Sequence, residues 1–453
     1  MVDVVVGRSL QSSWRNHDPR HLGGLFHFIV RLLLWVALLA ALSLVGWGLT
    51  AETRTSYLQS RIFSNLTRAM SFVVRPGPTG NFRFPKWGPY DERLGYAGLP
   101  GFIASLNADH FTVQRQAEWS DSLVRFVDLG NYAIYGEKPR AGLKLFDRDG
   151  NPLYRASYPQ RAYAGFTAIP PVVVDSLLFI EDHDLLDPQN PRRNPAVEWS
   201  RFALAVAGRT AGLVNRRFRA GGASTLATQT EKFRHSPDGR TPGIGEKLRQ
   251  MITASARAYQ NGPDTTAARR EIITTYLNSE PLASRPGYGE IIGVPEALWL
   301  WYGTELAEAN RVLTAPATTN AQLARKAEVF RQVLSLLLAG RRPAYYLIEH
   351  HGALAAMTDN YLRLLAAAGI IDAGLRDAAL HAELRFRADI PLPVPPERGG
   401  LAGLRLVALA DHRAFMAIDQ DRAAIDECNA KRDGSTGNYL RRTGLGPRVS
   451  SRG

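Results

Sequence analysis

The residues with the clearest chemical potential lie in the segment GGASTLATQTEKF, from Gly221 to Phe233. Paired glycines, a Ser-Thr pair and a lysine are residue types that hold phosphate groups in proteins. A nucleotide-binding P-loop places its lysine directly after the second glycine of its motif, whereas Lys232 lies ten residues beyond Gly222. The spacing excludes a nucleotide P-loop and leaves a phosphate site of another kind.

A helix would bring the polar residues of this segment together. Ser224 is a suitable cap for a helix that begins near Thr225. Thr225, Gln229 and Lys232 then fall at i, i+4 and i+7 on one face. Backbone N–H groups, the helix dipole and the lysine ammonium would offer a diphosphate several charge-assisted hydrogen bonds. The alternative is a capped helix with a solvated polar face.

Two acidic residues end an apolar stretch upstream. In VVVDSLLFIEDHDLLD, from Val172 to Asp187, an apolar helical pattern runs directly into Glu181 and Asp182. A carboxylate at the end of an apolar helix is a candidate general base. An acidic surface turn that closes the helix is the alternative.

Three further segments follow downstream. GEKLRQM (Gly245 to Met251) places Lys247 and Gln250 on one helix face. REIITTYLN (Arg270 to Asn278) ends a predicted helix with Tyr-Leu-Asn, and GVPEALWLWYG runs from Gly293 to Gly303. Any one of these segments is a weak signal, but their order and separations are specific together.

The five segments resemble the five motifs of the peptidoglycan glycosyltransferase domain of class A penicillin-binding proteins and monofunctional transglycosylases. The resemblance covers roughly residues 169–386. It implies a mainly α, lysozyme-like helical domain on the outer face of the membrane, which polymerises lipid II into glycan chains. The donor would be the growing glycan chain on undecaprenyl diphosphate.

The resemblance also implies roles for individual residues. Glu181 matches the residue that takes the proton of the acceptor 4-hydroxyl, which attacks the donor anomeric carbon with inversion as the diphosphate leaves. Gln250 stands where the family has a second catalytic glutamate, which is thought to help the diphosphate leave. The other positions expected to bind donor or acceptor are Asp182, Gly222, Ser224, Thr225, Gln229, Lys232, Lys247, Arg249, Tyr276 and Asn278.

The chain departs from the family's motifs at several positions. Asn194, Ala196 and Glu198 stand where the first motif normally has His-x-Gly-x-Asp, and Leu185 replaces a phenylalanine. Thr274 replaces the glutamate of the fourth motif. A second hypothesis is therefore a degenerate relative that binds lipid II or a cell-wall partner without turning it over. A lytic muramidase is a weaker third hypothesis, because cleaving an uncharged glycan needs no diphosphate site.

No metal site is predicted from the side chains. The single cysteine, Cys428, excludes an intramolecular disulfide and a cysteine metal cluster. A divalent cation, Mg²⁺ or Mn²⁺, could assist the leaving diphosphate, but Gln250 is a poorer ligand for a hard cation than glutamate. Arg249 could neutralise part of the leaving charge instead. We expect a weak dependence on divalent cations.

An uncharged segment near the N terminus predicts a membrane anchor. Residues 32–50 read LLLWVALLAALSLVGWGLT, which at ~1.5 Å per residue crosses most of a ~30 Å hydrocarbon core. Four arginines precede the segment and little net charge follows it, so we expect a single-pass protein of the cytoplasmic membrane with its N terminus inside. The main domain would lie on the periplasmic or outer face. A cleaved signal peptide is the alternative.

The net charge of +13 indicates an anionic partner. Next to a membrane anchor, the expected partners are lipid II and membrane phospholipid rather than nucleic acid, with cell-wall synthesis proteins as further candidates. Residues 194–219 combine apolar side chains with arginines and are expected to contact the membrane interface. An ordinary core-facing helix with a basic loop is equally compatible with that pattern.

The expected organisation has five parts. A basic cytoplasmic segment (residues 1–31) and the membrane helix (32–50) precede a small mixed α/β region (51–168) with a hairpin at Asp149-Gly150. The glycosyltransferase-like domain spans 169–390, and 391–453 form a linker and a weakly ordered tail. The chain has no S-x-x-K or K-T-G motif, so no transpeptidase domain is predicted.

Overall fold

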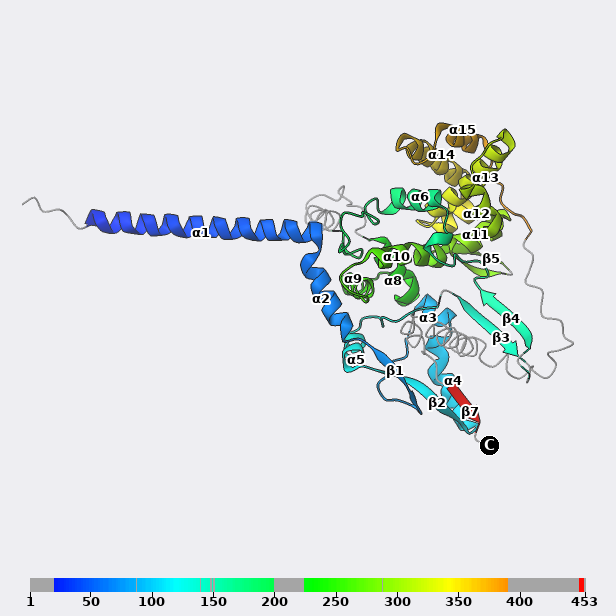
Figure 1. The fold of residues 1–453 in the computed structure, drawn as a ribbon, viewed down its shortest axis with the longest axis horizontal. Helices are drawn as coiled ribbons and strands as arrows, with labels where there is room; N and C mark the ends of the chain where they lie inside the picture. Colours follow the sequence, from blue (N-terminus) through cyan, green and yellow to red (C-terminus); the bar gives the residue numbers. More distant parts are fainter. Residues whose placement is uncertain are drawn as a thin grey trace, which may run out of the picture. The chain divides into compact units, whose positions relative to one another are not determined.

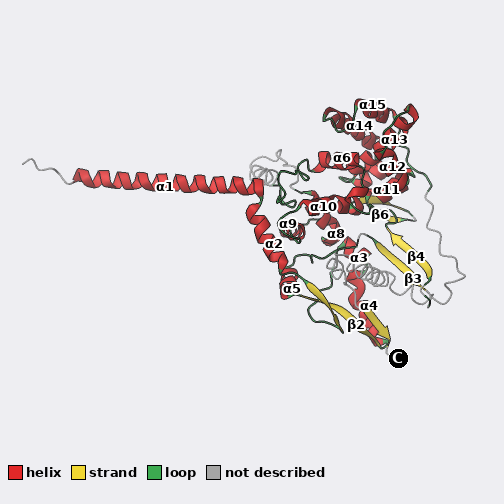
Figure 2. Cartoon of the chain, in the orientation of Figure 1, coloured by secondary structure: helices red, strands yellow, loops and turns green. Residues whose placement is uncertain are grey.

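The computed structural model describes residues 20–86, 88–138, 140–146, 149, 151–198, 224–286, 288–389 and 448–451. The chain divides into two units, Met1–Thr55 and Ser56–Gly453. The structure is mainly helical with small sheets, which confirms the predicted fold class (Figures 1 and 2).

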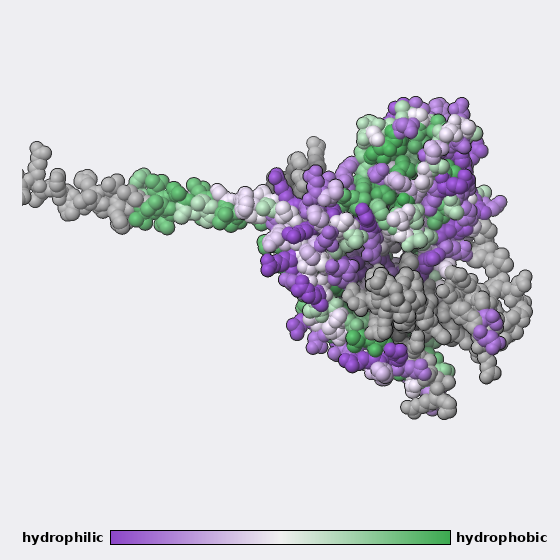
Figure 3. Space-filling model, viewed as in Figure 1, coloured by the Kyte–Doolittle hydropathy of each residue, from purple (hydrophilic) through white to green (hydrophobic). Residues whose placement is uncertain are grey.

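The described part of the first unit is one helix, α1 (Arg20–Thr55). Within the stretch Val30–Thr55 an 18-residue window has a mean hydropathy of 2.3, and its apolar side chains are exposed, including Trp47 at 70%. Figure 3 shows apolar residues along the middle of α1. This length and composition fit a membrane span, although a signal sequence near an N terminus has the same properties. The predicted span of residues 32–50 lies within this helix.

The second unit begins with a mixed region, residues 56–168. Its elements are α2 (Tyr57–Arg68), β1 (Phe72–Pro76), α3 (Pro89–Arg93), the 3₁₀ turn η1 (Tyr96–Gly98), α4 (Leu99–Ala108), β2 (Phe111–Trp119), α5 (Asp121–Asp128), β3 (Ala141–Phe146), β4 (Pro152–Tyr158) and η2 (Phe166–Ala168). Tyr96, Leu99, Trp119 and Leu123 are buried in its own hydrophobic core. The antiparallel β3–β4 pair confirms the predicted hairpin.

Helix α2 ends at Arg68, because Phe72 begins a strand that pairs with Trp119 of β2. Residues 78–86, between β1 and α3, are in neither helix nor strand. The start of β1 thus depends on pairing with a strand that is distant in sequence.

The remaining elements form the helical part of the unit. They are α6 (Pro171–Glu181), α8 (Leu226–His235), η3 (Pro237–Gly239), α9 (Ile244–Ala258), α10 (Thr266–Ser279), β5 (Pro281–Arg285), β6 (Gly289–Ile292), α11 (Val294–Tyr302), α12 (Leu306–Thr314), α13 (Asn320–Ala339), the π-helical turn η4 (Tyr345–Glu349), α14 (His351–Ala367) and α15 (Ala373–His381). The second half of α13 is buried on all sides, including Phe330, Leu334 and Leu338. Helices α6, α11, α12, α14 and α15 pack around it.

A short hairpin, β5–β6, interrupts the predicted helical pattern after α10. Pro281 cannot donate the backbone hydrogen bond that would extend α10, so the helix ends before it. Gly293 closes the hairpin at φ 80°, and a Cβ there would lie 2.8 Å from the carbonyl oxygen of Asn278. Only glycine permits this close approach, which holds the end of α10 against the start of α11.

The final described element is β7 (Arg448–Ser451), which pairs antiparallel with β2 in the sheet order β1-β2-β7. The rest of the predicted linker and tail lies outside the described residues.

Candidate functional site

Glu181 is the last residue of α6, as the sequence predicts. Pro171 at the first turn favours the helix start, and Val173 and Leu177 bury its inner face. The helix stops at Asp182, whose φ of −160° leaves the helical region. Asp182 is buried, whereas the side chain of Glu181 is partly exposed. The Glu181 carboxylate thus lies at the end of a helix and is accessible to a substrate.

Helix α8, which carries Gln229 and Lys232 on one face, begins one residue later than predicted. Thr225, not Ser224, is the cap, and its hydroxyl accepts a hydrogen bond from the backbone N–H of Thr228. The hydroxyl of Thr228 accepts one in return from the N–H of Thr225, which completes a capping box. Thr225 is 2% exposed. Its side chain therefore serves the helix, and the hydroxyl of Ser224 is left to contact other groups.

Gln229 joins α8 to α6. Its side-chain Nε2 donates a hydrogen bond of 3.1 Å to Oε2 of Glu181. Lys232 is one turn further along the same face of α8. Burial lowers the pKa of Lys232, while Glu280 and Glu181 act in the opposite direction. The candidate base thus favours the charged form of one candidate phosphate ligand, Lys232.

Lys247 on α9 supplies the second cation. Its Nζ donates to Oγ of Ser224 at 2.8 Å and to Oγ1 of Thr228 at 3.3 Å, so it lies over the amino end of α8. Burial, followed by repulsion from Lys232, lowers the pKa of Lys247 to about 8. Among the described residues, neither lysine forms a salt bridge with a carboxylate. Two half-buried ammonium groups, that of Lys247 at the amino end of α8 and that of Lys232 in its last turn, favour an anionic ligand.

Gln250 and Arg249, also on α9, contact other partners. Nε2 of Gln250 donates to Oγ of Ser236 at 2.8 Å and to Oγ1 of Thr241 at 2.9 Å, and the residue is 1% exposed. Arg249 donates to Glu246 at 2.6 Å. Among the described residues, the hydrogen-bond partners of both side chains therefore lie in the segment after α8 and on α9 itself, and they do not include Glu181 or Gln229.

Tyr276 and Asn278 end α10 and are both buried. Asn278 exchanges two hydrogen bonds with the backbone of Tyr163, at 2.8 and 2.9 Å. The hydroxyl of Tyr276 donates to Oε1 of Glu280 at 2.9 Å. These contacts fix the end of α10 against the mixed region and against Glu280.

Glu280 was not predicted as a site residue. It is 1% exposed, and it interacts electrostatically with both Glu181 and Lys232. The only sequence signal is a glutamate two residues after the Tyr-Leu-Asn segment, and nothing local shows that the chain buries it.

The residues that depart from the family's first motif also have structural contacts. Asn194 donates from Nδ2 to Ser255 on α9 at 3.0 Å and to Gln59 on α2 at 2.9 Å. Leu185 is fully buried, and its carbonyl oxygen accepts from the buried Arg269 at 2.9 Å. The substituted residues therefore make specific contacts: Asn194 with α2 and α9, and Leu185 with Arg269 of α10.

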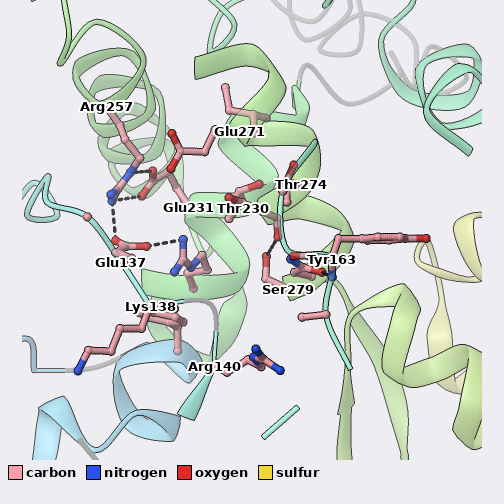
Figure 4. A pocket seen from close by; sticks show the side chains of 18 of the residues that line it. Glu137, Lys138, Arg140, Tyr163, Thr230, Glu231, Arg257, Glu271, Thr274 and Ser279 are labelled. Atoms are coloured by element: carbon pink, nitrogen blue, oxygen red, sulfur yellow. Dashed lines mark hydrogen bonds and ion pairs between the residues drawn. The ribbon is translucent and has the colours of Figure 1, made fainter. Parts of the chain in front are cut away.

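The opposite face of α8 borders a cavity of about 770 Å³ between the mixed region, α9 and α10. Figure 4 shows Arg257 lying between Glu137 and Glu231, with ion pairs of 2.9 and 2.7 Å. Thr230 and Glu231 line this cavity, whereas Gln229 and Lys232 point to the other side of the helix. The cavity is thus separate from the residues around Glu181.

Gly222 lies outside the described residues, as does most of the predicted interfacial segment, residues 199–219. Among the described residues, no group of three His, Cys, Asp or Glu side chains is arranged to hold a metal ion. The groups shown to act on Glu181 include the amide of Gln229 and the ammonium group of Lys232, and a protonated amine cannot ligate a divalent cation.

Comparison with known families agrees with the geometry. Residues 149–345 match the model of the transglycosylase family. This confirms the resemblance drawn from the five segments, and it supports peptidoglycan glycosyltransferase activity in general. No curated protein matches the chain.

Proposed function

Because residues 149–345 match the transglycosylase family, we propose that the protein polymerises lipid II into glycan strands and releases undecaprenyl diphosphate. The observation that carries the proposal is the hydrogen bond between Gln229 and Glu181, together with Lys232 on the same face of α8. It brings a general base and a phosphate ligand onto neighbouring helices.

Glu181 is the proposed general base. Its carboxylate accepts the proton of the acceptor 4-hydroxyl as the oxygen attacks the anomeric carbon of the donor. The bond between that carbon and the diphosphate oxygen breaks with its electron pair remaining on the diphosphate. Inversion follows because attack and departure occur on opposite faces of the sugar. The hydrogen bond from Gln229 orients the carboxylate for this proton transfer.

Lys232 and Lys247 are the proposed ligands of the diphosphate. Both lysines have lowered pKa values because they are partly buried, and in Lys247 repulsion from Lys232 adds to this effect. A bound diphosphate would offset both causes, since its negative charge favours the protonated amines. The same charge interaction grows as the bond to the sugar breaks, so it stabilises the leaving group. Ser224 holds Lys247 in place for this role.

The membrane is the proposed location of the reaction, with the N terminus in the cytoplasm and the second unit on the outer face. Helix α2 begins two residues after the apolar helix α1 ends. Exposed apolar side chains recur along α2 and α9, which contact each other. They are Leu58, Ile62, Leu66, Ile244, Leu248 and Ile252. Contact of these side chains with phospholipid would keep the site close to a lipid-linked substrate.

A second candidate function is lipid II binding without turnover, or binding of a cell-wall synthesis protein. The observation in its favour is Gln250, whose neutral amide is engaged by Ser236 and Thr241. A gel assay with fluorescent lipid II separates the two functions. Polymer formation supports the enzyme, whereas saturable binding without polymer supports the alternative.

A further inference from the structure

A buried carboxyl group lies behind the proposed site. Glu280 follows α10 directly and is 1% exposed. A Cβ on Gly340 would lie 1.6 Å from its Oε1, so the glycine after α13 leaves the space that this carboxyl occupies. Its backbone carbonyl oxygen accepts from the N–H of Gly293 at 2.8 Å. Three distant segments of the chain therefore enclose one glutamate.

Among the described residues, the carboxyl group has one hydrogen-bond donor. The hydroxyl of Tyr276 donates to Oε1 at 2.9 Å, and Oε2 is buried with no hydrogen-bond partner in the described part of the chain. A buried carboxylate is normally paired with a cation or receives several hydrogen bonds. This environment favours the neutral acid, which has a smaller desolvation cost.

Ring contacts link Glu280 to the face of α8 that carries Gln229 and Lys232. The rings of Tyr276 and Phe233 lie 6.1 Å apart, and Nζ of Lys232 lies 4.3 Å from the centre of the Phe233 ring. On the same face of α8, Gln229 holds Glu181. Glu280 is thus linked to the proposed phosphate ligand Lys232 through the rings of Tyr276 and Phe233.

We propose that Glu280 is a positioning residue of the proposed glycosyl transfer: a buried, neutral acid that lets Glu181 and Lys232 keep opposite charges beside it. The inference rests on the proposed function for its effect on turnover. The protonation of Glu280 is a property of the protein alone.

Charged and titratable groups face Glu280 from three elements: Glu181 from α6, Lys232 from α8 and Tyr276 from α10, with Arg341 beyond α13 acting on Tyr276. Burial is the largest influence and raises the pKa of Glu280 to about 8; the Tyr276 hydrogen bond and Lys232 oppose this, and Glu181 adds to it. Below that pH, Glu280 is neutral and the Glu181–Lys232 pair carries no net charge. Above it, the group of three gains a negative charge, which repels a diphosphate.

The first test needs no substrate. Infrared difference spectra of the full-length protein in detergent are recorded between pH 6 and pH 9, with Glu280→Gln as the variant. We expect a carboxylic-acid C=O band in the parent that disappears near pH 8 and is missing from the variant. The same band in both proteins would overturn the inference.

Thermal unfolding provides a second, independent readout. An acid whose folded pKa is raised binds its proton more tightly when folded, so its stabilising effect is lost as pH rises toward the folded pKa. Glu280→Gln should therefore unfold at a higher temperature than the parent at pH 8, with a smaller difference at pH 5. Tyr276→Phe, which removes the donor to Oε1, should move the infrared transition to higher pH. A Glu280→Gln difference that is equal at both pH values would contradict the inference.

Turnover tests the positioning role. Lys247 also titrates near pH 8, so both proteins carry Lys247→Arg, which keeps the positive charge. In the protein that retains Glu280, kcat/KM for lipid II should fall by up to about tenfold between pH 7 and pH 9, as expected for one ionisation near pH 8. In the protein that also carries Glu280→Gln, the fall over the same range should be clearly smaller. Equal falls in both proteins would overturn the positioning role. If the parent protein with Lys247 intact does not polymerise lipid II, the proposed function fails, while the infrared result still decides the protonation of Glu280.

Discussion

The side-chain amide of Gln229 donates a hydrogen bond of 3.1 Å to the carboxylate of Glu181. The two residues come from helices α8 and α6, which are separated by more than forty residues of sequence. The contact orients one oxygen of the proposed base. Lys232 on the same face of α8 places positive charge near that base, and Lys247 lies above the amino end of the helix.

Removing the Gln229 amide should reduce turnover more than binding. In Gln229→Ala, the Glu181 carboxylate loses its orienting donor, so kcat for lipid II should fall by about tenfold, the equivalent of one hydrogen bond. Steady-state kinetics at pH 7 provide the measurement, with the exposed Gln189→Ala as the matched control. A similar loss of kcat in both variants would show that Gln229 has no specific role in turnover.

Lys232→Ala should weaken binding of undecaprenyl diphosphate by roughly 10- to 100-fold, since a hydrogen bond to a charged group contributes about 1.5–3 kcal/mol. Competition against labelled lipid II gives the affinity, and the Tm monitors folding. Lys326→Ala serves as the control, because this lysine lies on α13 and contacts the carbonyl oxygen of Ala315. Unchanged affinity in Lys232→Ala would exclude it as a phosphate ligand.

Binding of the diphosphate should depend on pH through Lys247. The pKa of this amine in the free protein is lowered to about 8, so its positive charge is present below that pH and is lost above it. Affinity for undecaprenyl diphosphate should therefore decrease as pH rises through about 8, at constant ionic strength. Lys247→Arg keeps its charge and should bind with a flatter pH profile. Parallel profiles for the two proteins would contradict this role of Lys247.

Gln250→Glu restores the residue type of the family's third motif. The new carboxylate would lie near Glu246, because Ser236 contacts both positions, so the Tm should fall. If position 250 acts on the leaving diphosphate, polymerisation and its response to Mg²⁺ or Mn²⁺ should rise despite that loss. Time courses with and without the cations provide the measurement. A lower Tm without any gain in rate or cation response would restrict Gln250 to a structural role.

The buried charges behind α8 should be critical for folding. Glu137 contacts Arg234, His235 and Arg257, all largely buried. Glu137→Gln leaves these groups without their shared anion and should destabilise the protein by about 3–5 kcal/mol. Urea unfolding monitors the effect, and the exposed Glu349→Gln is the control. A change below about 1 kcal/mol would indicate that water replaces the Glu137 contacts.

The same cluster gives stability a defined pH dependence. Burial disfavours the charged form of His235, but Glu137 and Asp91 outweigh this and raise its pKa to about 10. A raised histidine pKa stabilises the fold fully below its unfolded value, near 6.5, and this contribution is lost as pH rises toward 10. His235→Gln should therefore destabilise the protein more at pH 6 than at pH 10. An equal effect at both pH values would show that His235 is not charged in the fold.

Local sequence patterns predicted the helix that ends at Glu181 and the face of α8 that carries Gln229 and Lys232, because helical periodicity and caps act over a few residues. The same patterns placed the cap of α8 one residue early, since both Ser224 and Thr225 are suitable caps and tertiary packing selects between them. Glu280 could not be found in this way. The space that it occupies is created by Gly340, sixty residues further along the chain.

Long-range contacts also explain the other differences. Asn278 has the position of a substrate ligand in the motif, but its amide pairs with the backbone of Tyr163 in the mixed region. The strand β1 depends on pairing with β2, more than thirty residues away. No pattern within either segment encodes its partner.

The most direct test of the central claim, that Glu181 is the base of a lipid II polymerase, is a lipid II time course for the parent and Glu181→Gln, with binding measured in parallel. The substitution keeps the size of the side chain and removes its basicity. We predict glycan polymer in the parent, a rate lower by about 10²–10⁴ in the variant, and similar lipid II affinity in both. Equal polymerisation rates would contradict the role of Glu181, and a parent that binds lipid II without forming polymer would contradict the enzymatic function.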